Sequence, residues 1–343
     1  MSINCKNPII IGGSGSSGST LLATIINRHP EISIGPELSL FNKPALYNQP
    51  YHLFSKNLER YIVKGTSTRG WFLYWKTLRE LKKYGWDRNE LIEMSYKCKN
   101  NIEFIDAFFN RYLEENDSSI WAEKTPSNSY YFKSFLKLYP NGRIIHIYRD
   151  YRDVVSSLKK RGMNSYYASM LYLYNSAAAL ACRNQENYYD LSYEDLVTNP
   201  AKSIKDLCKF LNVSYDNKMI KVSSGDNVNK IKSWSNSPYE AIRSNSIKGK
   251  NRILTNYDHF VFNHVQISGI HKKKFNLDID SIKKVNDILG YDYGINHSRK
   301  AIKVFYMLKL SLSFLIDNFK RLVVMIYIDK ALYPLPGKIK LWK

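Results

Sequence analysis

The sequence predicts an α/β fold in which a central parallel sheet is flanked by helices. Short apolar runs alternate with segments of helical periodicity between residues 8 and 211, as they do in parallel sheets with right-handed crossovers. A loop of Gly and Ser follows the first apolar run directly, which is typical of a strand that turns into a helix. Ligands of such sheets bind at the carboxyl ends of the strands, so functional residues are expected in the loops there.

The expected strands are short apolar runs bounded by polar or turn residues. They are residues 8–12, 32–34, 120–123, 143–148 and 188–192. The expected helices show apolar residues three and four apart. They are residues 18–28, 128–139, 154–160, 166–186, 200–211 and 278–289. Pro30 and Pro140 follow two of these helices, because proline has no N–H to continue the helical pairing.

Two regions depart from this alternation of strands and helices. Between residues 41 and 119, aromatic and charged residues recur at helical spacing, which predicts a helical insertion near the site. Residues 215–274 are basic and rich in Asn and Ser, and we expect irregular structure there. We assign residues 1–296 to one domain and residues 297–343 to a basic, amphipathic C-terminal extension.

The extension contains a long helical pattern, residues 303–328. Asp317, Lys320 and Arg321 lie in its middle, and each would cost about 2.5–3.5 kcal/mol at the centre of a bilayer. We therefore do not expect this helix to span a membrane. It can lie on an anionic membrane surface, as a peripheral contact, or dock on the domain or on a partner subunit.

Composition narrows the partners and the compartment. The net charge of +21 favours an anionic partner, such as a nucleotide, an acidic glycan, an anionic membrane or a nucleic acid. The four cysteines are far apart in the sequence, so no zinc site is expected. The polar residues before Pro8 do not resemble a secretion signal, and a cytoplasmic location is the simplest expectation.

The Gly-Ser loop, residues 13–18, has the features of a phosphate site. A glycine-rich turn gathers backbone N–H groups at the positive end of the following helix, where a phosphate binds. The spacing of Gly13, Gly18 and Thr20 matches a Walker A loop, but Ser19 stands where nucleotide-hydrolysing enzymes need Lys. The candidate phosphate-binding residues are Gly15, Ser16, Ser17, Gly18, Ser19 and Thr20.

A second candidate anion site follows the strand at residues 143–148. Arg149 comes directly after this strand, and Ser157 lies on the next helix, with Arg161 one turn further along the same face. A guanidinium can bond two oxygens of a phosphate at once, and a hydroxyl can bond a third. The alternative is that Arg149 only pairs with a neighbouring Asp at the surface.

Together these motifs resemble those of the sulfotransferases that use 3′-phosphoadenosine 5′-phosphosulfate (PAPS). The Gly-Ser loop resembles their 5′-phosphosulfate loop, and Arg149 with Ser157 resembles their 3′-phosphate pair. Residues 191–196 resemble a third element, whose Tyr, here Tyr193, packs near the adenosine. Ser246 and Lys250 resemble a late phosphate-contacting stretch of the family. The resemblance implies a P-loop-like architecture and no metal.

Within this family, the chain is most similar to tyrosylprotein sulfotransferases and their bacterial carbohydrate-type relatives. The similarity rests on His29-Pro30-Glu31 followed by Gly35-Pro36-Glu37. It implies that Glu37 is the general base on the acceptor hydroxyl. It also implies that Lys124, in Glu-Lys-Thr-Pro, contacts the leaving and transferred oxygens.

One position departs from the family. Ser16 stands where these relatives usually carry Arg or Lys, so a cation on the sulfate is missing. We expect transfer of a sulfuryl group from PAPS to a hydroxyl, with a glycan or glycolipid acceptor favoured over a protein tyrosine or a small alcohol. The alternatives are a catalytically weak nucleotide-binding relative and a P-loop kinase-like phosphotransferase. Nucleic-acid binding is the least favoured use of the charge.

Overall fold

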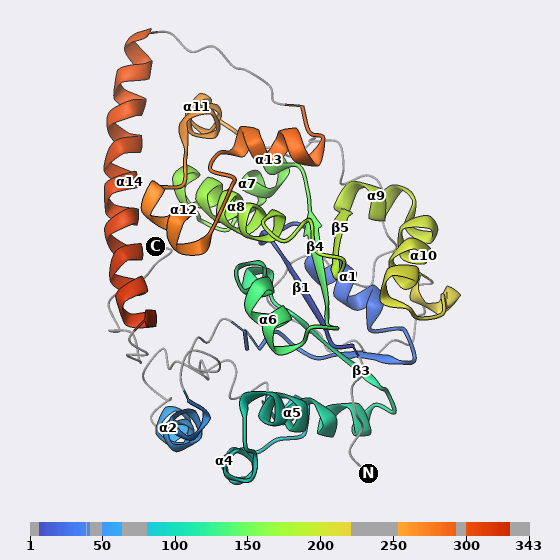
Figure 1. Ribbon diagram of the computed structural model, residues 1–343. Helices are drawn as coiled ribbons and strands as arrows, with labels where there is room; N and C mark the ends of the chain where they lie inside the picture. The colour runs from blue at the N-terminus through green and yellow to red at the C-terminus, as the bar shows by residue number, and fades with distance from the viewer. Residues whose placement is uncertain are drawn as a thin grey trace.

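The computed structural model describes residues 7–38, 40–41, 50–63, 81–220, 253–292 and 300–329. Within these residues, a five-stranded parallel sheet runs through the protein with helices on both faces (Figure 1). The strands are β1 (Ile9–Gly13), β2 (Ile32–Ile34), β3 (Ile120–Lys124), β4 (Arg143–Tyr148) and β5 (Tyr188–Ser192). The predicted α/β class and each of the predicted strands are confirmed.

The order of the strands is β2-β3-β1-β4-β5, with β1 at the centre. Every neighbouring pair is parallel, so all carboxyl ends lie at one edge of the sheet. In register, Ile11 of β1 lies opposite Lys124 of β3, and Gly13 lies opposite Ile147 of β4. The Gly-Ser loop therefore leaves the sheet between the ends of two flanking strands.

The helices connect these strands and cover the sheet. Before β4 they are α1 (Ser19–Ile26), α2 (Tyr51–Val63), α4 (Arg88–Lys97), α5 (Asn101–Glu115) and α6 (Phe132–Leu138). After β4 they are α7 (Tyr151–Lys160), α8 (Ser165–Leu180), α9 (Tyr193–Thr198), α10 (Pro200–Leu211), α11 (Asn256–His264), α12 (Gly269–Phe275), α13 (Ile282–Leu289) and α14 (Lys300–Asp329). Short 3₁₀ helices are η2 (Lys82–Tyr84), η3 (Pro126–Tyr131) and η4 (Asn217–Met219).

Some expected boundaries were wrong. The helix expected at residues 128–139 is split into η3 and α6, because the Asn128 amide is drawn onto the Ile11 carbonyl of β1 at 3.2 Å. Helix α7 begins at Tyr151, earlier than expected, because the Asp150 side chain accepts from the backbone N–H of Arg152 and caps the helix. Helix α8 ends at Leu180, before the expected residue 186.

The expectation of irregular structure at residues 215–274 was wrong in its described part. Helices α11 and α12 lie there, together with η4. Thr255 and Asp258 form a reciprocal capping box at the start of α11, and Ser268 caps α12. These caps are readable in the sequence, and the high Asn, Ser and Lys content obscured them.

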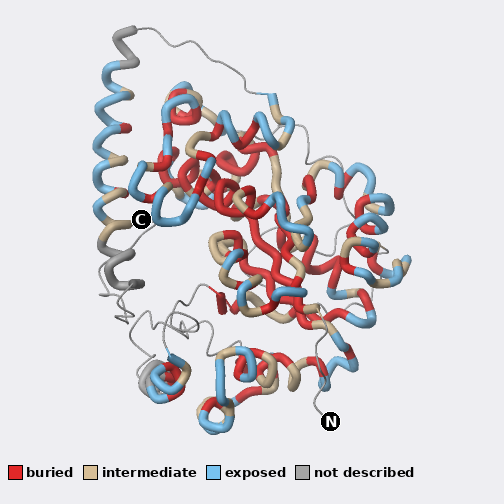
Figure 2. The backbone as a smooth tube through the Cα atoms, viewed as in Figure 1, coloured by how far each residue is buried: buried red, intermediate tan, exposed pale blue. Residues whose placement is uncertain are grey.

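The two faces of the sheet pack against different helices. Ile9 and Ile11 of β1 lie in a cluster with α1 and α10, while Ile10 faces the opposite side, as the two-residue period of a strand requires. The opposite side is covered by α2, α5 and α6, and Figure 2 shows the strands of the sheet as mostly buried. The ring of Phe109 from α5 stacks on Trp121 of β3 with 4.2 Å between centroids. The helices at residues 51–115 therefore share a core with the sheet.

A further cluster of buried residues joins the helices after β4. Helix α8 lies at its centre, and α7, α11, α13 and α14 contribute to it. Helix α14 runs along one edge of the molecule beside α11 and α12 (Figure 1). Among the described helices, none is long and apolar enough to cross a membrane.

His146 lies in the middle of β4 and is fully buried. Its Nδ1 atom forms a hydrogen bond of 2.9 Å with the hydroxyl of Tyr188. Burial disfavours the charged ring and lowers the pKa of His146 to about 3. His146 is thus a structural residue of the core, as its apolar neighbours in the sequence indicate.

This buried ring predicts a loss of stability in mild acid. The folded pKa is below the unfolded value of about 6.5, so the stabilisation is fully present above that pH and is lost as the pH falls towards the folded pKa. Between pH 7 and pH 5, protonation in the unfolded state should lower the unfolding free energy by about 2 kcal/mol. Urea unfolding of wild type and His146→Gln at both pH values measures this, and an equal loss in both proteins would contradict it.

Candidate functional site

The candidate residues follow all five strands of the sheet at one edge. The Gly-Ser loop follows β1, and Glu37 lies in the loop after β2. Lys124 ends β3, Arg149 follows β4, and Tyr193 follows β5. Because the strands are parallel, their carboxyl ends bring these loops together, which is where α/β sheets bind ligands.

The Gly-Ser loop is held in shape by its own bonds. The carbonyl of Ser14 accepts from the backbone N–H of Ser17 at 3.2 Å and from its hydroxyl at 2.7 Å. The Ser17 hydroxyl therefore already donates a hydrogen bond within the loop. This bond competes with the phosphate binding expected of Ser17. Ser16 and Gly18 adopt positive φ angles of 73° and 95°, which turn the chain into α1.

Helix α1 begins at Ser19 without a side-chain cap and without an acidic residue in its first turn. The N–H groups of Ser19 and Thr20 belong to this first turn, which has no intrahelical partners for them. The positive end of the helix dipole is thus offered to an anion at the mouth of the loop. That a phosphate binds at this loop stays a prediction.

Lys124, the last residue of β3, contacts both the loop after β2 and the first turn of α1. Its ammonium group forms an ion pair with the carboxylate of Glu37 and donates to the Thr20 hydroxyl at 3.3 Å. The side chain of Lys124 is 5% exposed, whereas that of Glu37 is 31% exposed. A buried cation therefore lies beside the start of α1, next to a carboxylate that is open to approach from solvent.

Tyr193 connects the Gly-Ser loop to Arg149. A Cβ atom placed on Gly18 would lie 2.3 Å from Cδ2 of the Tyr193 ring, so the ring rests on the bare backbone of the loop. The guanidinium of Arg149 lies over the same Tyr193 ring, 4.3 Å from its centroid. Arg149 also pairs with Asp153 at 3.8 Å. The structure thus brings the two expected anion sites together across one aromatic ring.

The remaining predicted residues lie on α7 or outside the described residues. A Cβ atom on Gly15 would lie 3.7 Å from Leu158, which places α7 beside the loop. Ser157 is half-buried on this helix, and Arg161 is exposed at its C-terminal cap. Ser246 and Lys250 lie outside the described residues.

Sequence reasoning missed Glu123, a buried carboxylate beside Lys124. It accepts hydrogen bonds from the Leu38 N–H at 3.2 Å, from the Thr125 hydroxyl at 2.6 Å and from the Asn128 amide. Burial raises the pKa of Glu123, and the bonds from Thr125, Asn128 and Leu38 oppose that rise. Glu123 thereby fixes the loop that carries Glu37 against the end of β3. The sequence signal that could have identified Glu123 is a Glu next to the last residue of a buried strand.

Sequence reasoning also missed Glu194, which ties the loops after β4 and β5 together. Its carboxylate accepts from the backbone N–H of Asp150 at 3.1 Å, from the Ser192 hydroxyl at 3.2 Å and from the Tyr291 hydroxyl at 2.7 Å. Asp150 and Glu194 are the direct neighbours of Arg149 and Tyr193 in the chain. Glu194 therefore sets the distance between the arginine and the ring.

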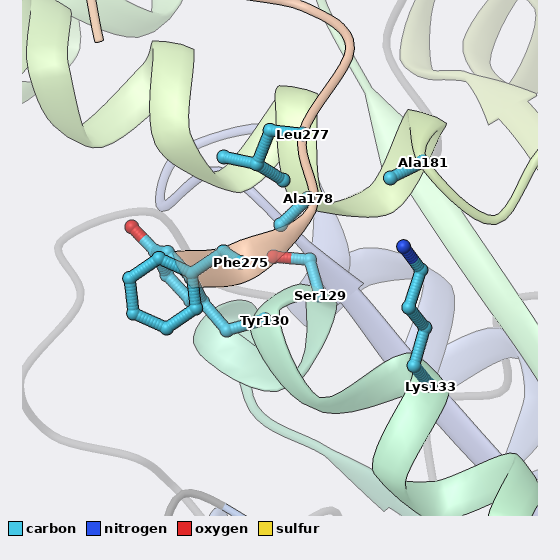
Figure 3. A pocket seen from close by; sticks show the side chains of 7 residues that line it. All are labelled: Ser129, Tyr130, Lys133, Ala178, Ala181, Phe275 and Leu277. Carbon is cyan, nitrogen blue, oxygen red and sulfur yellow. The ribbon is translucent and has the colours of Figure 1, made fainter. Parts of the chain in front are cut away.

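A small cavity of about 20 Å³ lies apart from this site. None of the candidate residues lines it, and its size suits about one water molecule (Figure 3). Its lining residues come from η3, α6, α8 and its C-cap, α12 and the chain after α12: Ser129, Tyr130, Lys133, Ala178, Ala181, Phe275 and Leu277. Among the described residues, no group of three or more His, Cys, Asp or Glu side chains is placed to hold a metal ion.

A sequence model of the sulfotransferase family matches residues 8–217. The chain belongs to the sulfotransferase family. The matched segment contains the Gly-Ser loop, Glu37, Lys124, Arg149 and Tyr193. Members of this family transfer sulfuryl groups, and the match supports sulfuryl transfer as the general chemistry of this sulfotransferase.

The sulfotransferase is also similar to individual proteins. It is 23% identical over 229 residues to a putative protein-tyrosine sulfotransferase of Caenorhabditis briggsae, covering 63% of this chain and 69% of that protein. The sulfotransferase domain of the Synechococcus PCC 7002 olefin synthase superposes with a TM-score of 0.56 at 21% identity, covering 85% of this chain and 98% of that domain. The sulfotransferase domain from the curacin biosynthetic pathway has a TM-score of 0.50 at 19% identity, covering 84% of this chain and 99% of that domain. The two structures support the fold.

The contact between Gly18 and Tyr193 predicts a steric effect of one methyl group. Gly18→Ala should lower the unfolding free energy by about 2 kcal/mol, because it adds a Cβ to a left-handed residue and displaces the ring. Gly15→Ala is the matched control in the same loop, since its Cβ would meet only an ordinary contact at 3.7 Å. Denaturant unfolding compares the two, and equal stabilities would show that the ring does not rest on Gly18.

Proposed function

We propose that this sulfotransferase transfers the sulfuryl group of PAPS to a hydroxyl group of an acceptor. The observation that carries the proposal is the Arg149–Tyr193–Gly18 contact, which joins a guanidinium to the phosphate-type loop. PAPS carries anionic groups at its 3′ and 5′ positions, and a site for it needs two anion-binding positions near an aromatic surface. The uncapped start of α1 and the guanidinium of Arg149 meet this requirement.

In this proposal each anionic end of the donor has its own residues. The backbone N–H groups at the start of α1, with Ser19 and Thr20, hold the 5′-phosphosulfate. Arg149 and Ser157 hold the 3′-phosphate, with Arg161 beyond them on α7. Tyr193 contributes the surface near the adenosine. Ser246 and Lys250 are assigned to the same phosphate by their resemblance to the family alone.

When bound, PAPS supplies an activated sulfuryl group on a good leaving phosphate. The S–O bond to the acceptor oxygen forms as the S–O bond to the 5′-phosphate breaks, and adenosine 3′,5′-bisphosphate (PAP) leaves with the bridging oxygen. Glu37, which pairs with Lys124, takes the proton of the acceptor hydroxyl. Lys124 stabilises the negative charge that develops on the bridging oxygen.

For the acceptor we propose a glycan or a glycolipid. The net charge of +21 suits an acidic acceptor as well as an acidic donor. The loop that carries Glu37 is braced by Tyr84, whose hydroxyl donates to the Pro36 carbonyl at 2.7 Å. This bond ties the loop of Glu37 to η2. Because one relative is named a protein-tyrosine sulfotransferase, an acceptor test must also include a tyrosine peptide.

The nucleotide site is tested by PAP binding, because this does not require the acceptor. Arg149→Ala should weaken PAP binding by at least about tenfold, since a charge-assisted contact is lost. Arg183→Ala is the matched control, because Arg183 pairs with Asp278 away from the site. Isothermal titration calorimetry measures both variants. Unchanged affinity in Arg149→Ala would remove Arg149 from the site, and absence of PAP binding by wild type would overturn the proposal.

The role of Glu37 is tested by turnover. Glu37→Gln should bind PAP with wild-type affinity and lower sulfate transfer from labelled PAPS by about a hundredfold, because the acceptor hydroxyl loses its base. Glu31→Gln is the control, since Glu31 is an exposed carboxylate nearby in the chain. The acceptor panel contains acidic glycans, glycolipids and tyrosine peptides. Transfer at the wild-type rate by Glu37→Gln would place the base elsewhere.

A catalytically weak nucleotide-binding protein is the second candidate. It is favoured by Ser16, a small neutral residue where the relatives usually have a cation. Its hydroxyl is shielded from solvent and has no hydrogen-bond partner among the described residues. PAP binding without transfer to any acceptor of the panel would support this function over the enzyme.

A further inference from the structure

Helix α14 presents a row of large apolar side chains to solvent. Eight of the fifteen large hydrophobic residues that are exposed in the described part of the chain lie on it, with exposed fractions of 43% to 69%. They are Val304, Phe305, Met307, Leu308, Leu312, Leu315, Ile316 and Phe319. Their spacing of three and four residues places most of them on one face of the helix. In Figure 2 most of the described part of α14 has the colour of exposed residues.

The opposite face of α14 is fixed to the protein. Asp317 is 1% exposed and accepts from Arg321 at 2.8 Å and from the Tyr166 hydroxyl at 3.4 Å. The guanidinium of Arg321 lies 4.0 Å from the ring centroid of Tyr174 on α8. Leu310 is buried in the same core cluster. The polar and aromatic contacts thus set the rotation of α14, and the apolar row points outward as a result.

Basic residues border this apolar row. Lys309 and Lys320 directly follow Leu308 and Phe319 in the chain, and their ammonium groups lie 4.4 and 5.7 Å from the ring centroids of Tyr257 and Tyr167. Residues 297–343 contain ten Lys and Arg residues and two Asp residues. An apolar row with a basic border is the pattern of a helix that lies in the interface of an anionic membrane.

We propose that the outward face of α14 binds an anionic lipid surface. The apolar side chains enter the boundary between headgroups and acyl chains, while the excess of basic residues in the extension attracts the anionic headgroups. Charge complementarity favours this occupant over a second copy, because pairing two such faces would bring together two basic segments of chains that each carry +21. The proposal extends beyond sulfuryl transfer and does not rest on it.

The test is co-sedimentation of the full chain with lipid vesicles. Wild type should pellet with vesicles of phosphatidylcholine and phosphatidylglycerol, and more weakly with phosphatidylcholine alone. Leu308→Ser/Leu312→Ser/Leu315→Ser should bind the anionic vesicles at least about tenfold more weakly, because apolar area is lost from the contact. The matched control is Ile102→Ser/Ile270→Ser/Ile288→Ser, whose residues are also exposed but lie on α5, α12 and α13.

Three results would overturn this inference. Wild type remaining in the supernatant with anionic vesicles is one, and vesicle binding by the triple leucine variant at wild-type strength is another. The third is a dimer that forms without lipid and is lost in the leucine variant, which would assign the face to a second copy. A thermal shift on addition of PAP shows whether the leucine variant is folded and still binds nucleotide. Loss of vesicle binding can then be told apart from loss of the nucleotide site.

Discussion

The contact between the ring of Tyr193 and the backbone of Gly18 is the constraint on which the site depends. The strands that lead to these residues, β5 and β1, are separated by β4 and share no hydrogen bonds. The ring closes this gap, because only a residue without a side chain lets it approach the loop so closely. Arg149, which follows the intervening strand, is then stacked on the same ring. Three strand ends are thus held together by one aromatic side chain.

Carboxylates maintain the geometry around this contact. Glu123 holds the loop of Glu37 against β3, and Glu194 holds the loops of Arg149 and Tyr193 against each other. Each accepts a hydrogen bond from a backbone N–H of a neighbouring loop, and this bond holds that loop in place. In a chain with an excess of basic residues, Glu123 and Glu194 serve the shape of the site through these hydrogen bonds. The side chain of Glu37 is 31% exposed and is open to solvent.

Much of the fold was predictable because its signals are local. Apolar runs marked the five strands, and the Gly-Ser loop marked the turn into α1. The positions of Lys124 and Arg149 at one edge followed from the parallel sheet alone. The capped helices α11 and α12 were missed, since their polar composition concealed short capping motifs. The bonds of Glu123 and Glu194 could not be predicted, because their partners come from distant loops and depend on how those loops pack.

The stacking of Phe109 on Trp121 has a consequence for the modularity of the chain. Helices α2 and α5 supply side chains to the same core as β3 and β4, so the sheet presents apolar side chains to these helices. Replacing this segment by that of another protein would uncover Trp121 and its aromatic neighbours. These helices are therefore an integral part of the core of the sheet, and they could be exchanged only together with the residues of the sheet that they cover.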